Sequence, residues 1–182
     1  MLELASHILD IAENSVRAGA SLVEITIIED EESNIFSIEI NDDGCGMTEE
    51  EIRKVFDPFY TTKKVRRVGL GVPLLSDAAQ RAGGDLSLTS IKGKGTNLKV
   101  TFELNHLDRQ PLGDIVGTLI ILIAGNSFVD FLYKHMHNDH QFSLDTRTIR
   151  KEIDDLPMKH PDILKYIRNV IHDGLSEIQT SA

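Results

Sequence analysis

The first part of the chain repeats apolar positions with the period of an amphipathic helix. Between residues 2 and 18 these positions are three or four residues apart: Leu2, Ala5, Leu9, Ala12 and Val16. Side chains at this spacing share one face of a helix, and Gly19 is a residue type that often ends one. The pattern predicts a helix over residues 2–18 with one buried face.

A period of two residues follows this helix. Residues 23–29 are rich in β-branched side chains, and apolar positions alternate with polar ones over residues 35–40. The polar segment 30–34 has the composition of a turn, so the two strands are expected to form a hairpin. Residues 86–91 and 98–104 predict two more strands, joined through a Gly-Lys-Gly turn.

Two helical segments lie between these pairs of strands. Thr48 is a typical N-cap and three glutamates follow it, which favours a short helix. Residues 72–81 predict a second helix, ended by Gly83 and Gly84, and residues 57–71 resemble a loop. Together the elements predict helices on one face of a mixed sheet, an α/β sandwich of the α+β class.

The pattern changes after about residue 105. The expected elements are a buried helix over residues 115–124, a short hairpin over 128–136 and 141–144, and helices over 146–156 and 162–178. Asp145 or Thr146 is expected to cap the first of the last two helices. We therefore divide the chain into a domain over residues 1–105 and a small α+β C-terminal region over residues 106–182.

Composition narrows the function classes. The chain carries 29 acidic and 19 basic residues, a formal net charge of −10, which argues against a nucleic-acid-binding surface. The single cysteine, Cys45, excludes an internal disulfide framework and fits a reducing compartment. The N-terminus lacks the pattern of a signal peptide, and the apolar run 115–124 is shorter than the roughly 20 residues that span a bilayer. We expect a cytoplasmic protein without a membrane span.

Five short motifs stand in a fixed order within the first hundred residues: Asp10 to Asn14, Asn41 to Gly46, Phe56 to Lys63, Val68 to Gly71, and Gly93 to Thr96. Each is weak alone, but the ordered set is hard to obtain by chance. Over residues 2–104 the set resembles the GHKL superfamily of gyrase, heat-shock chaperone, histidine-kinase and mismatch-repair ATPases. It is most similar to the ATP-binding domain of histidine kinases and to stand-alone bacterial ATP-binding proteins. The resemblance implies a Bergerat fold that binds ATP with Mg²⁺.

The first motif carries the candidate metal ligand and catalytic residue. An amide oxygen such as that of Asn14 suits Mg²⁺, which is usually shared with substrate phosphates. Asp10 lies one helical turn earlier, on the same face. The resemblance implies that Asp10 orients the attacking group, although most of these families use glutamate there. Two alternatives stay open: Asp10 joins Asn14 at the metal, or Glu13 is the base.

The second motif carries the candidate adenine-binding residues. A carboxylate at a strand end can accept a hydrogen bond from the adenine amino group, where guanine presents a carbonyl. The resemblance implies this role for Asp43. Gly44 and Gly46 allow the backbone to turn tightly and approach the ring, and Met47 is assigned to the same nucleotide site.

The third motif resembles the F box and short lid of one histidine-kinase subgroup. In it Phe59 anchors the loop, Thr62 belongs to the site, and Lys63 is the candidate contact to the terminal phosphate. Three further basic residues could take the place of Lys63: Lys64, Arg66 and Arg67.

The last two motifs complete the candidate site. Gly69, Leu70, Gly71 and Val72 precede or open a helix, where free backbone amides and the helix dipole favour phosphate. The match is imperfect, because Arg67 and Val68 replace small residues and Pro73 follows; proline is tolerated in a first helical turn. Thr96 of the Gly-Lys-Gly-Thr turn is expected to help fix Asp43 or the adenine.

Two features invite other chemistry. His135, His137 and His140 form a cluster, but no cysteine or carboxylate spacing supports a zinc site, so we expect surface histidines. Cys45 lies inside the second motif, where nothing activates a thiol, and is interpreted as filler.

The expected function is that of an ATP–Mg²⁺ binding regulator that hydrolyses ATP slowly or switches with nucleotide state through the lid at residues 57–71. A kinase acting in trans on a partner's side chain and a non-catalytic ATP-binding module are the alternatives. His7 has no apparent role as a phosphoacceptor. Residues 106–182 could dock on the nucleotide domain, form a homodimer or receive an unidentified protein partner.

Overall fold

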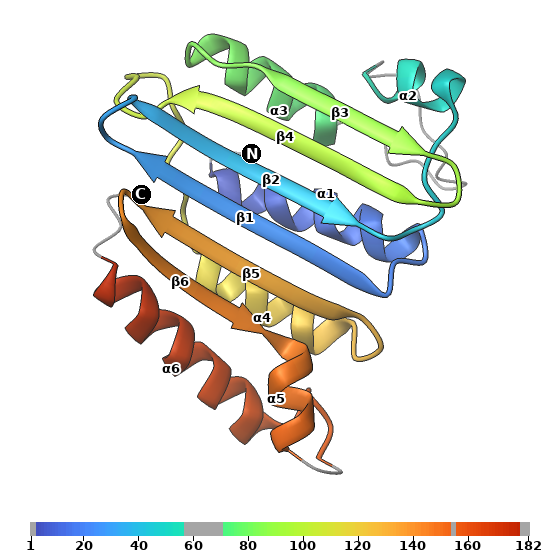
Figure 1. The fold of residues 1–182 in the computed structure, drawn as a ribbon, viewed down its shortest axis with the longest axis vertical. Helices are drawn as coiled ribbons and strands as arrows, with labels where there is room; N and C mark the ends of the chain where they lie inside the picture. The colour runs from blue at the N-terminus through green and yellow to red at the C-terminus, as the bar shows by residue number, and fades with distance from the viewer. Residues whose placement is uncertain (1–2, 57–70, 154–155, 179–182) are drawn as a thin grey trace.

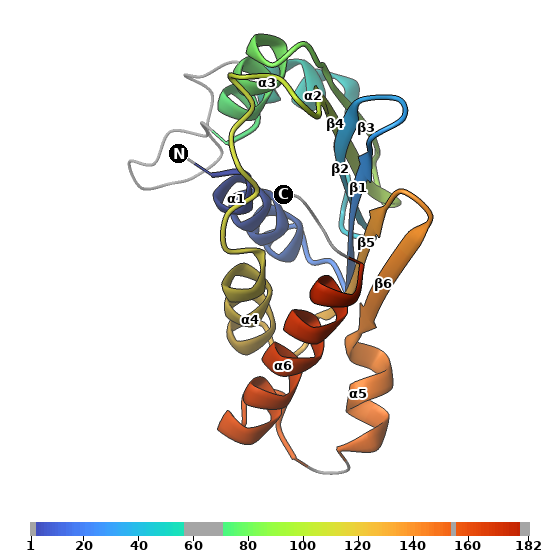
Figure 2. The same cartoon turned by 90° about the vertical axis from the view of Figure 1, so that its left-hand side faces the viewer.

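A computed structural model of the chain describes residues 3–56, 71–153 and 156–178. In these residues one six-stranded sheet carries a layer of helices on one face (Figures 1 and 2). The strands, in their order across the sheet, are β3 (Leu86–Ile91), β4 (Gly95–Glu103), β2 (Ile35–Asp42), β1 (Leu22–Asp30), β5 (Asp130–His137) and β6 (His140–Asp145). The predicted α/β sandwich with a mixed sheet is therefore confirmed.

The helices that the sequence predicts within residues 1–105 are present. They are α1 (Leu4–Arg17), α2 (Glu49–Val55) and α3 (Gly71–Arg81). Thr48 caps α2 in a reciprocal capping box, in which its side chain accepts from the Glu51 amide and the Glu51 carboxylate accepts from the Thr48 amide. The β1–β2 hairpin is antiparallel, with Val23 opposite Asp42 and Asp30 opposite Ile35. Strand β2 thus extends two residues beyond its predicted end at Ile40.

The C-terminal helices are α4 (Ile115–Gly125), α5 (Thr146–Glu152) and α6 (Pro161–Glu177). The predicted hairpin is the antiparallel pair β5–β6. Asp145 is the N-cap of α5, which ends several residues before the predicted limit at residue 156. Proline opens α6, where a missing amide proton costs nothing.

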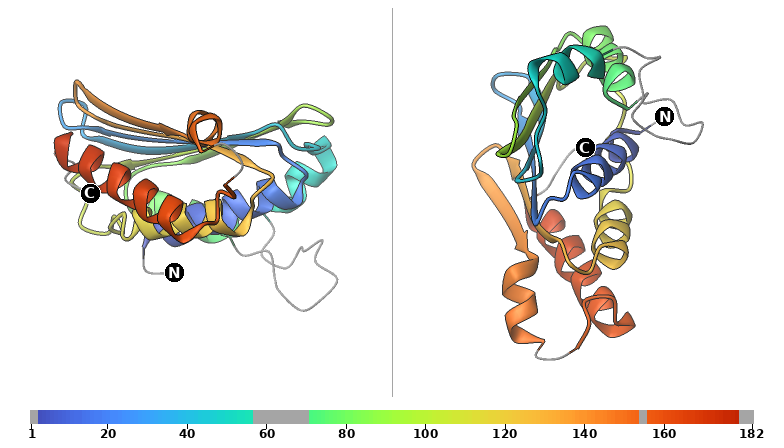
Figure 3. Two further views of the ribbon diagram at one scale, coloured as in Figure 1. Left: turned by 90° about the horizontal axis from the view of Figure 1, so that it is seen from below. Right: turned by 90° about the vertical axis from the view of Figure 1, so that its right-hand side faces the viewer.

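The two regions of the chain share one sheet. Strand β5 pairs in parallel with β1, from Leu22 opposite Asp130 to Glu29 opposite His137. Helix α4 packs between α1 and α6, and α6 runs beside α4 towards β6 (Figure 3). The division at residue 105 stays a prediction, but residues 106–178 continue the architecture of the first region instead of forming a separate sheet.

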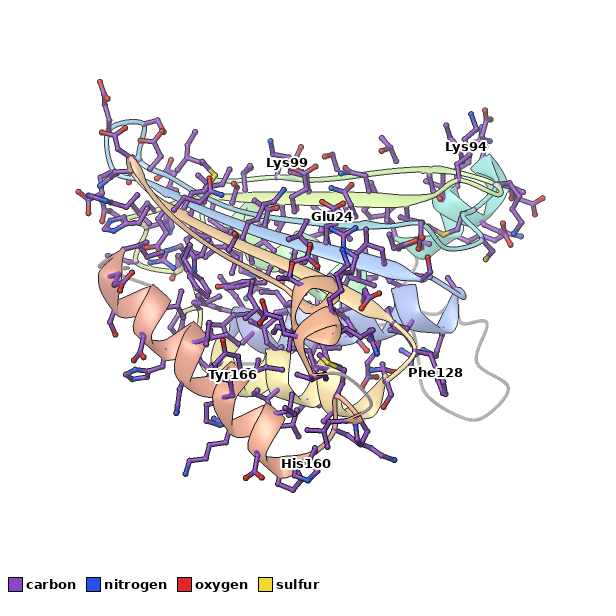
Figure 4. All side chains as sticks on the ribbon, turned by 60° about the horizontal axis from the view of Figure 1, so that its bottom comes forward. Glu24, Lys94, Lys99, Phe128, His160 and Tyr166 are labelled. Carbon is purple, nitrogen blue, oxygen red and sulfur yellow. The ribbon has the colours of Figure 1, made fainter. Side chains whose placement is uncertain are left out.

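The core lies between the sheet and the helices. Alternate residues of the central strands face it, and α1 covers them with Leu4, Ile8 and Ile11. Among the described residues, no helix covers most of the opposite face of the sheet, and Lys99 projects from this face (Figure 4). In the same view Phe128 and Tyr166 point outwards; Phe128 is 99% exposed.

The expectation of surface histidines is wrong for His135 and His137 and is confirmed for His140, which is exposed. Both buried rings are on β5, an interior strand whose odd-numbered residues face the core. His135 is fully buried: the Tyr133 hydroxyl lies 2.7 Å from its Nδ1, and its Nε2 lies 2.8 Å from the carboxylate of Glu29. With the Tyr133 hydroxyl beside Nδ1 and the Glu29 carboxylate beside Nε2, both ring nitrogens of His135 have a hydrogen-bond partner. Burial raises the pKa of Tyr133, which keeps its hydroxyl a donor.

Candidate nucleotide-binding site

A pocket of about 550 Å³ opens between α1, the loop after β2, α2, the start of α3 and the β3–β4 hairpin. Lys94 marks the tip of that hairpin, which lies beside α2 (Figures 1 and 4). The pocket is lined by Asp10, Ile11, Asn14, Ser15, Arg17, Ala18, Ile40, Asp42, Cys45, Gly46, Met47, Glu51, Val55, Gly71, Val72, Leu88, Lys92, Thr96 and Leu98. Polar groups at both ends of an apolar cavity are the usual composition of a small-molecule site.

Asp10 and Gly71 meet where α1 and α3 converge. A Cβ on Gly71 would lie 2.0 Å from Oδ2 of Asp10, closer than atoms can approach. Glycine at this position therefore allows the Asp10 carboxylate to lie against the first turn of α3. Gly71 and Val72 both line the pocket, so the first turn of α3 lies beside it.

Asn14 lines the pocket one turn of α1 after Asp10. Its Oδ1 accepts a hydrogen bond of 2.7 Å from Nη2 of Arg17. A second guanidinium nitrogen of Arg17 donates to Glu13 at 3.4 Å. Glu13 itself does not line the pocket, so the geometry favours Asp10 over Glu13 as the carboxylate of the site.

Arg17 is a pocket cation that sequence reasoning missed. The sequence spacing could have identified Arg17, because a residue three positions after Asn14 lies on the same face of a helix. Its side chain is half exposed, so it can move without disturbing the core. In this structure the Arg17 guanidinium donates a hydrogen bond to Oδ1 of Asn14, the oxygen that the sequence analysis assigns to the metal.

Asp42, and not the predicted Asp43, supplies a carboxylate to the wall of the pocket. Asp43 does not line the pocket. Its Oδ1 accepts from the amides of Ser21 and Leu22 at 2.7 and 2.9 Å, and its Oδ2 accepts from the Ser21 hydroxyl. Burial alone would raise the pKa of Asp43, but these hydrogen bonds together lower it. Asp43 thus fastens the start of β1 on the opposite side of the loop.

Asp42 is held in the pocket by two hydrogen bonds. The Ser15 hydroxyl donates to its Oδ2 at 2.6 Å, and the Gly44 amide donates to its Oδ1 at 2.9 Å. Ser15 is buried on α1, and Gly44 lies two residues after the end of β2. The carboxylate is therefore oriented before any ligand arrives.

The remaining predicted residues shape the same wall of the pocket. Gly46 has φ 59°, and a Cβ there would lie 2.1 Å from the Ile91 carbonyl oxygen, so only glycine fits. The Met47 amide donates to the Ser90 hydroxyl at 2.8 Å, and that hydroxyl lies 2.9 Å from the Thr96 hydroxyl. Met47 and Thr96 line the pocket, whereas Gly44 does not line it and donates to Asp42.

Two further lining residues have roles that the motifs did not reveal. Lys92 donates to the Gly46 carbonyl at 3.3 Å and pairs with Glu51 of α2 at 3.5 Å, which joins the hairpin to the loop and to α2. Cys45, which the sequence analysis interprets as filler, is exposed and lines the pocket.

Part of the predicted site lies outside the described residues. The predicted residues outside these ranges are Phe59, Thr62, Lys63, Gly69 and Leu70, with the alternatives Lys64, Arg66 and Arg67. Within the described ranges, no group of three or more histidine, cysteine or acidic residues could hold a metal ion. Nor is any helix there long and apolar enough to cross a membrane.

Comparison with known proteins identifies the family. The model of the family described as "Histidine kinase-, DNA gyrase B-, and HSP90-like ATPase" matches residues 2–106, more than half of the chain. The sensor histidine kinase WalK of Bacillus subtilis (strain 168) is 36% identical over 93 residues, which cover 48% of this chain and 15% of that protein. Sporulation kinase E of the same organism is 35% identical over 69 residues, covering 38% and 9%.

A third relative matches a longer segment of this chain. The sensor histidine kinase ZraS of Escherichia coli (strain K12) is 24% identical over 110 residues, covering 60% of this chain and 23% of that protein. The chain thus matches less than a quarter of the length of each of these kinases.

A solved structure described as the N-terminal domain of a DNA repair protein superposes with a TM-score of 0.56 at 16% identity. The superposition covers 80% of this chain and 53% of that one, and it supports the fold alone. The α/β sandwich, the ordered motifs and the family match agree: the chain belongs to the family of histidine kinase-, DNA gyrase B- and HSP90-like ATPases, with the GHKL-type Bergerat fold.

Proposed function

We propose that this chain binds ATP with Mg²⁺ in the pocket between α1, α3 and the β3–β4 hairpin, and that it acts as a nucleotide-dependent regulator. The observation that carries the proposal is the Asp42 carboxylate, oriented in the pocket by Ser15 and Gly44. A fixed carboxylate accepts a hydrogen bond from the exocyclic amine of adenine and disfavours the carbonyl of guanine. Thr96 and Met47 lie beside it as further neighbours for the base.

The opposite end of the pocket suits the phosphates. The first amides of α3 and its dipole attract anions at Gly71 and Val72. Asn14 would hold Mg²⁺ through its amide oxygen, and bound Mg²⁺ would neutralise phosphate charge. Because Arg17 now donates to that oxygen, we propose that Arg17 releases Asn14 when nucleotide binds and turns its charge towards the phosphates.

Asp10 is the proposed catalytic residue. Its carboxylate lies against the start of α3, where the terminal phosphates would be, and it lines the pocket on the same face of α1 as Asn14. There it would accept a proton from, or orient, the attacking group. If this group is water, the result is slow hydrolysis. The predicted lid at residues 57–71 and the C-terminal region would pass the nucleotide state to a protein partner or a second copy.

A kinase acting in trans is the second candidate. It is favoured by the relatives, which are named as sensor histidine kinases and sporulation kinases. In that case Asp10 would orient a side chain of the partner instead of water.

A matched pair of aspartates tests the nucleotide site. We expect calorimetry at pH 7.5 to show Mg²⁺-dependent binding of ATP and much weaker binding of GTP. Asp42→Asn should weaken ATP binding at least tenfold, since a hydrogen bond to a charged group is worth about 1.5–3 kcal/mol. Asp43→Asn is the matched control, because it makes the same change at the neighbouring residue. It should leave the ATP affinity within about twofold, since the Asp43 side chain does not line the pocket. Equal losses in both variants, or no ATP binding by the wild type, would refute the assignment.

Measuring the fate of the γ-phosphate of ATP distinguishes hydrolysis from a kinase activity. Phosphate release by the protein alone would support hydrolysis, and label transfer from γ-labelled ATP to a partner would support the kinase. In either case Asp10→Asn should lower the rate far more than it lowers ATP affinity. A parallel loss of rate and affinity would place Asp10 with Asn14 at the metal instead.

A further inference from the structure

Helix α4 carries no charged side chain along Ile115–Gly125, although the whole chain has a net charge of −10. Its inner face, which includes Leu119 and Leu122, is buried in the core. Its outer face is apolar as well, and Ile121 on this face is 56% exposed. A helix that is apolar on every side is normally buried on every side. The outer face of α4 is therefore a candidate for a contact with another molecule.

Small and large residues alternate on this outer face. Gly117 and Ala124 are seven positions apart, so they lie along one line of the helix, with isoleucines on either side. Phe128, which is 99% exposed, follows the helix and points outwards (Figure 4). We call the following residues the α4 face; those within the helix are its exposed and half-exposed positions: Val116, Gly117, Ile120, Ile121, Ala124, Gly125 and Phe128.

The order of small and large residues on the α4 face is complementary to its own reverse. A second α4 helix can lie antiparallel to the first, with a two-fold axis through the middle of residues 121–124. Each large residue then meets a small one, as the packing of ridges into grooves requires, and each contact occurs twice. The facing pairs, one residue from each copy, are Ile121 with Ala124, Ile120 with Gly125, and Gly117 with Phe128.

Charge also favours a second copy of this chain. Two copies that each carry a net charge of −10 repel one another over most of their surfaces. The uncharged α4 face is a surface at which they approach without opposing like charges on the helix. A helix that binds a lipid surface typically carries lysine or arginine beside its apolar face, and α4 has neither.

We propose that the α4 face forms a homodimer in which two α4 helices pack antiparallel across a two-fold axis. The helix has 11 residues and is about 16 Å long. The pair therefore buries less than the roughly 800 Å² per partner of a standard interface, and we expect a dimer that dissociates at micromolar concentrations. Because α4 packs beside α1 (Figure 2), the dimer would bring together the helices that carry Asp10 and Asn14. The interface does not depend on nucleotide.

Sedimentation of the full chain without nucleotide, over a range of micromolar concentrations, tests the dimer. We expect the mass of the wild type to rise from one chain to two. Ile121→Glu should raise the dissociation constant at least tenfold, because it buries an unpaired carboxylate in the interface. Ile91→Glu on β3 is the matched control, because Ile91 is 59% exposed and lies outside the α4 face; it should leave the dissociation constant within about twofold.

Three results would overturn the homodimer. The first is a wild type that stays monomeric at every concentration. The second is an equal loss of association in Ile121→Glu and Ile91→Glu. The third is a monomeric wild type that sediments with phosphatidylcholine–phosphatidylglycerol vesicles, because the α4 face would then bind a bilayer.

The antiparallel register has a separate test. Ala124→Leu keeps the α4 face apolar but fills the space opposite Ile121, so it should raise the dissociation constant at least fivefold. Association through apolar area alone would instead become tighter in this variant, and that result would refute the register. In a dimer assembled from one copy labelled at isoleucine methyl groups and one labelled at alanine methyl groups, we expect a nuclear Overhauser effect between Ile121 and Ala124 of different copies. A dimer without this signal would also refute the register.

Discussion

His137 should make the stability of this protein depend on pH in a predictable direction. Its Nδ1 lies 2.9 Å from the carbonyl oxygen of Ile178, which follows α6, and its Nε2 lies 3.1 Å from the carboxylate of Glu31. Both neighbours only accept hydrogen bonds, so an imidazolium satisfies both and a neutral ring satisfies one. The Ile178 carbonyl is the main cause of a raised pKa of His137, opposed by burial and assisted by Glu31 and Glu29.

The magnitude follows from the two contacts. Deprotonation changes the hydrogen bond to Ile178 from a charged one of about 1.5–3 kcal/mol to a neutral one of about 0.5–1.5 kcal/mol. The Glu31 side chain is 56% exposed, so its pairing adds only about 0–1 kcal/mol. We expect a total of about 1–2 kcal/mol. Because the folded pKa is raised above the unfolded value, this stabilisation is fully present below about pH 6.5 and is lost as pH rises through the folded pKa.

Urea denaturation from pH 5.5 to 8.5 measures this effect as a difference between variants. His137→Gln keeps one donor and cannot titrate, so it should be less stable than the wild type by about 1–2 kcal/mol at pH 5.5 and by less at pH 8.5. His140→Gln, three residues later and exposed, should follow the wild type at every pH. A difference between His137→Gln and wild type that is constant, or that grows with pH, would refute the reasoning.

Two further predictions concern the nucleotide pocket. Cys45 is the single cysteine and lines the pocket, so saturating Mg²⁺–ATP should slow its alkylation by iodoacetamide at least tenfold, whereas GTP should not; equal rates with and without ATP would contradict the site. Gly46→Ala places a Cβ 2.1 Å from the Ile91 carbonyl oxygen and should lower the free energy of unfolding by about 2–4 kcal/mol in urea denaturation. Gly93→Ala is the matched control, because its φ is also positive but nothing lies within 4 Å of the added atom; it should cost only about 1–2 kcal/mol, and equal losses would mean that the clash has no effect.

The aspartate of the pocket could have been predicted from the sequence by following the strand alternation further. Ile38 and Ile40 face the core, and strand β2 continues through residue 42. A period of two then places Asp42 on the side of α1 and Asp43 on the opposite side. The strand predicted from the sequence ends at Ile40. The alternation was therefore not extended to Asp42 and Asp43, and nothing else in the sequence distinguished the two aspartates.

Other features depend on contacts between distant parts of the chain. The spacing of His135 and His137 placed both on one face of a strand, but their burial requires β5 to pair with β1, more than a hundred residues earlier. Likewise, helical periodicity places His7 on the buried face of α1. A cavity beside it, however, is completed by the segment after β4. Local periodicity predicts elements and faces, whereas these neighbours are set by long-range packing.

The pairing of β5 with β1 bears on whether residues 106–182 are a separate unit. The family match ends at residue 106, and without the C-terminal region β1 would be an edge strand of the sheet. An unprotected edge favours association with other chains. Glu29, fully buried beside His135, would also lose that contact. The C-terminal region therefore completes the sheet beside the candidate pocket, and α4 packs on both α6 and α1, the helix that carries Asp10 and Asn14.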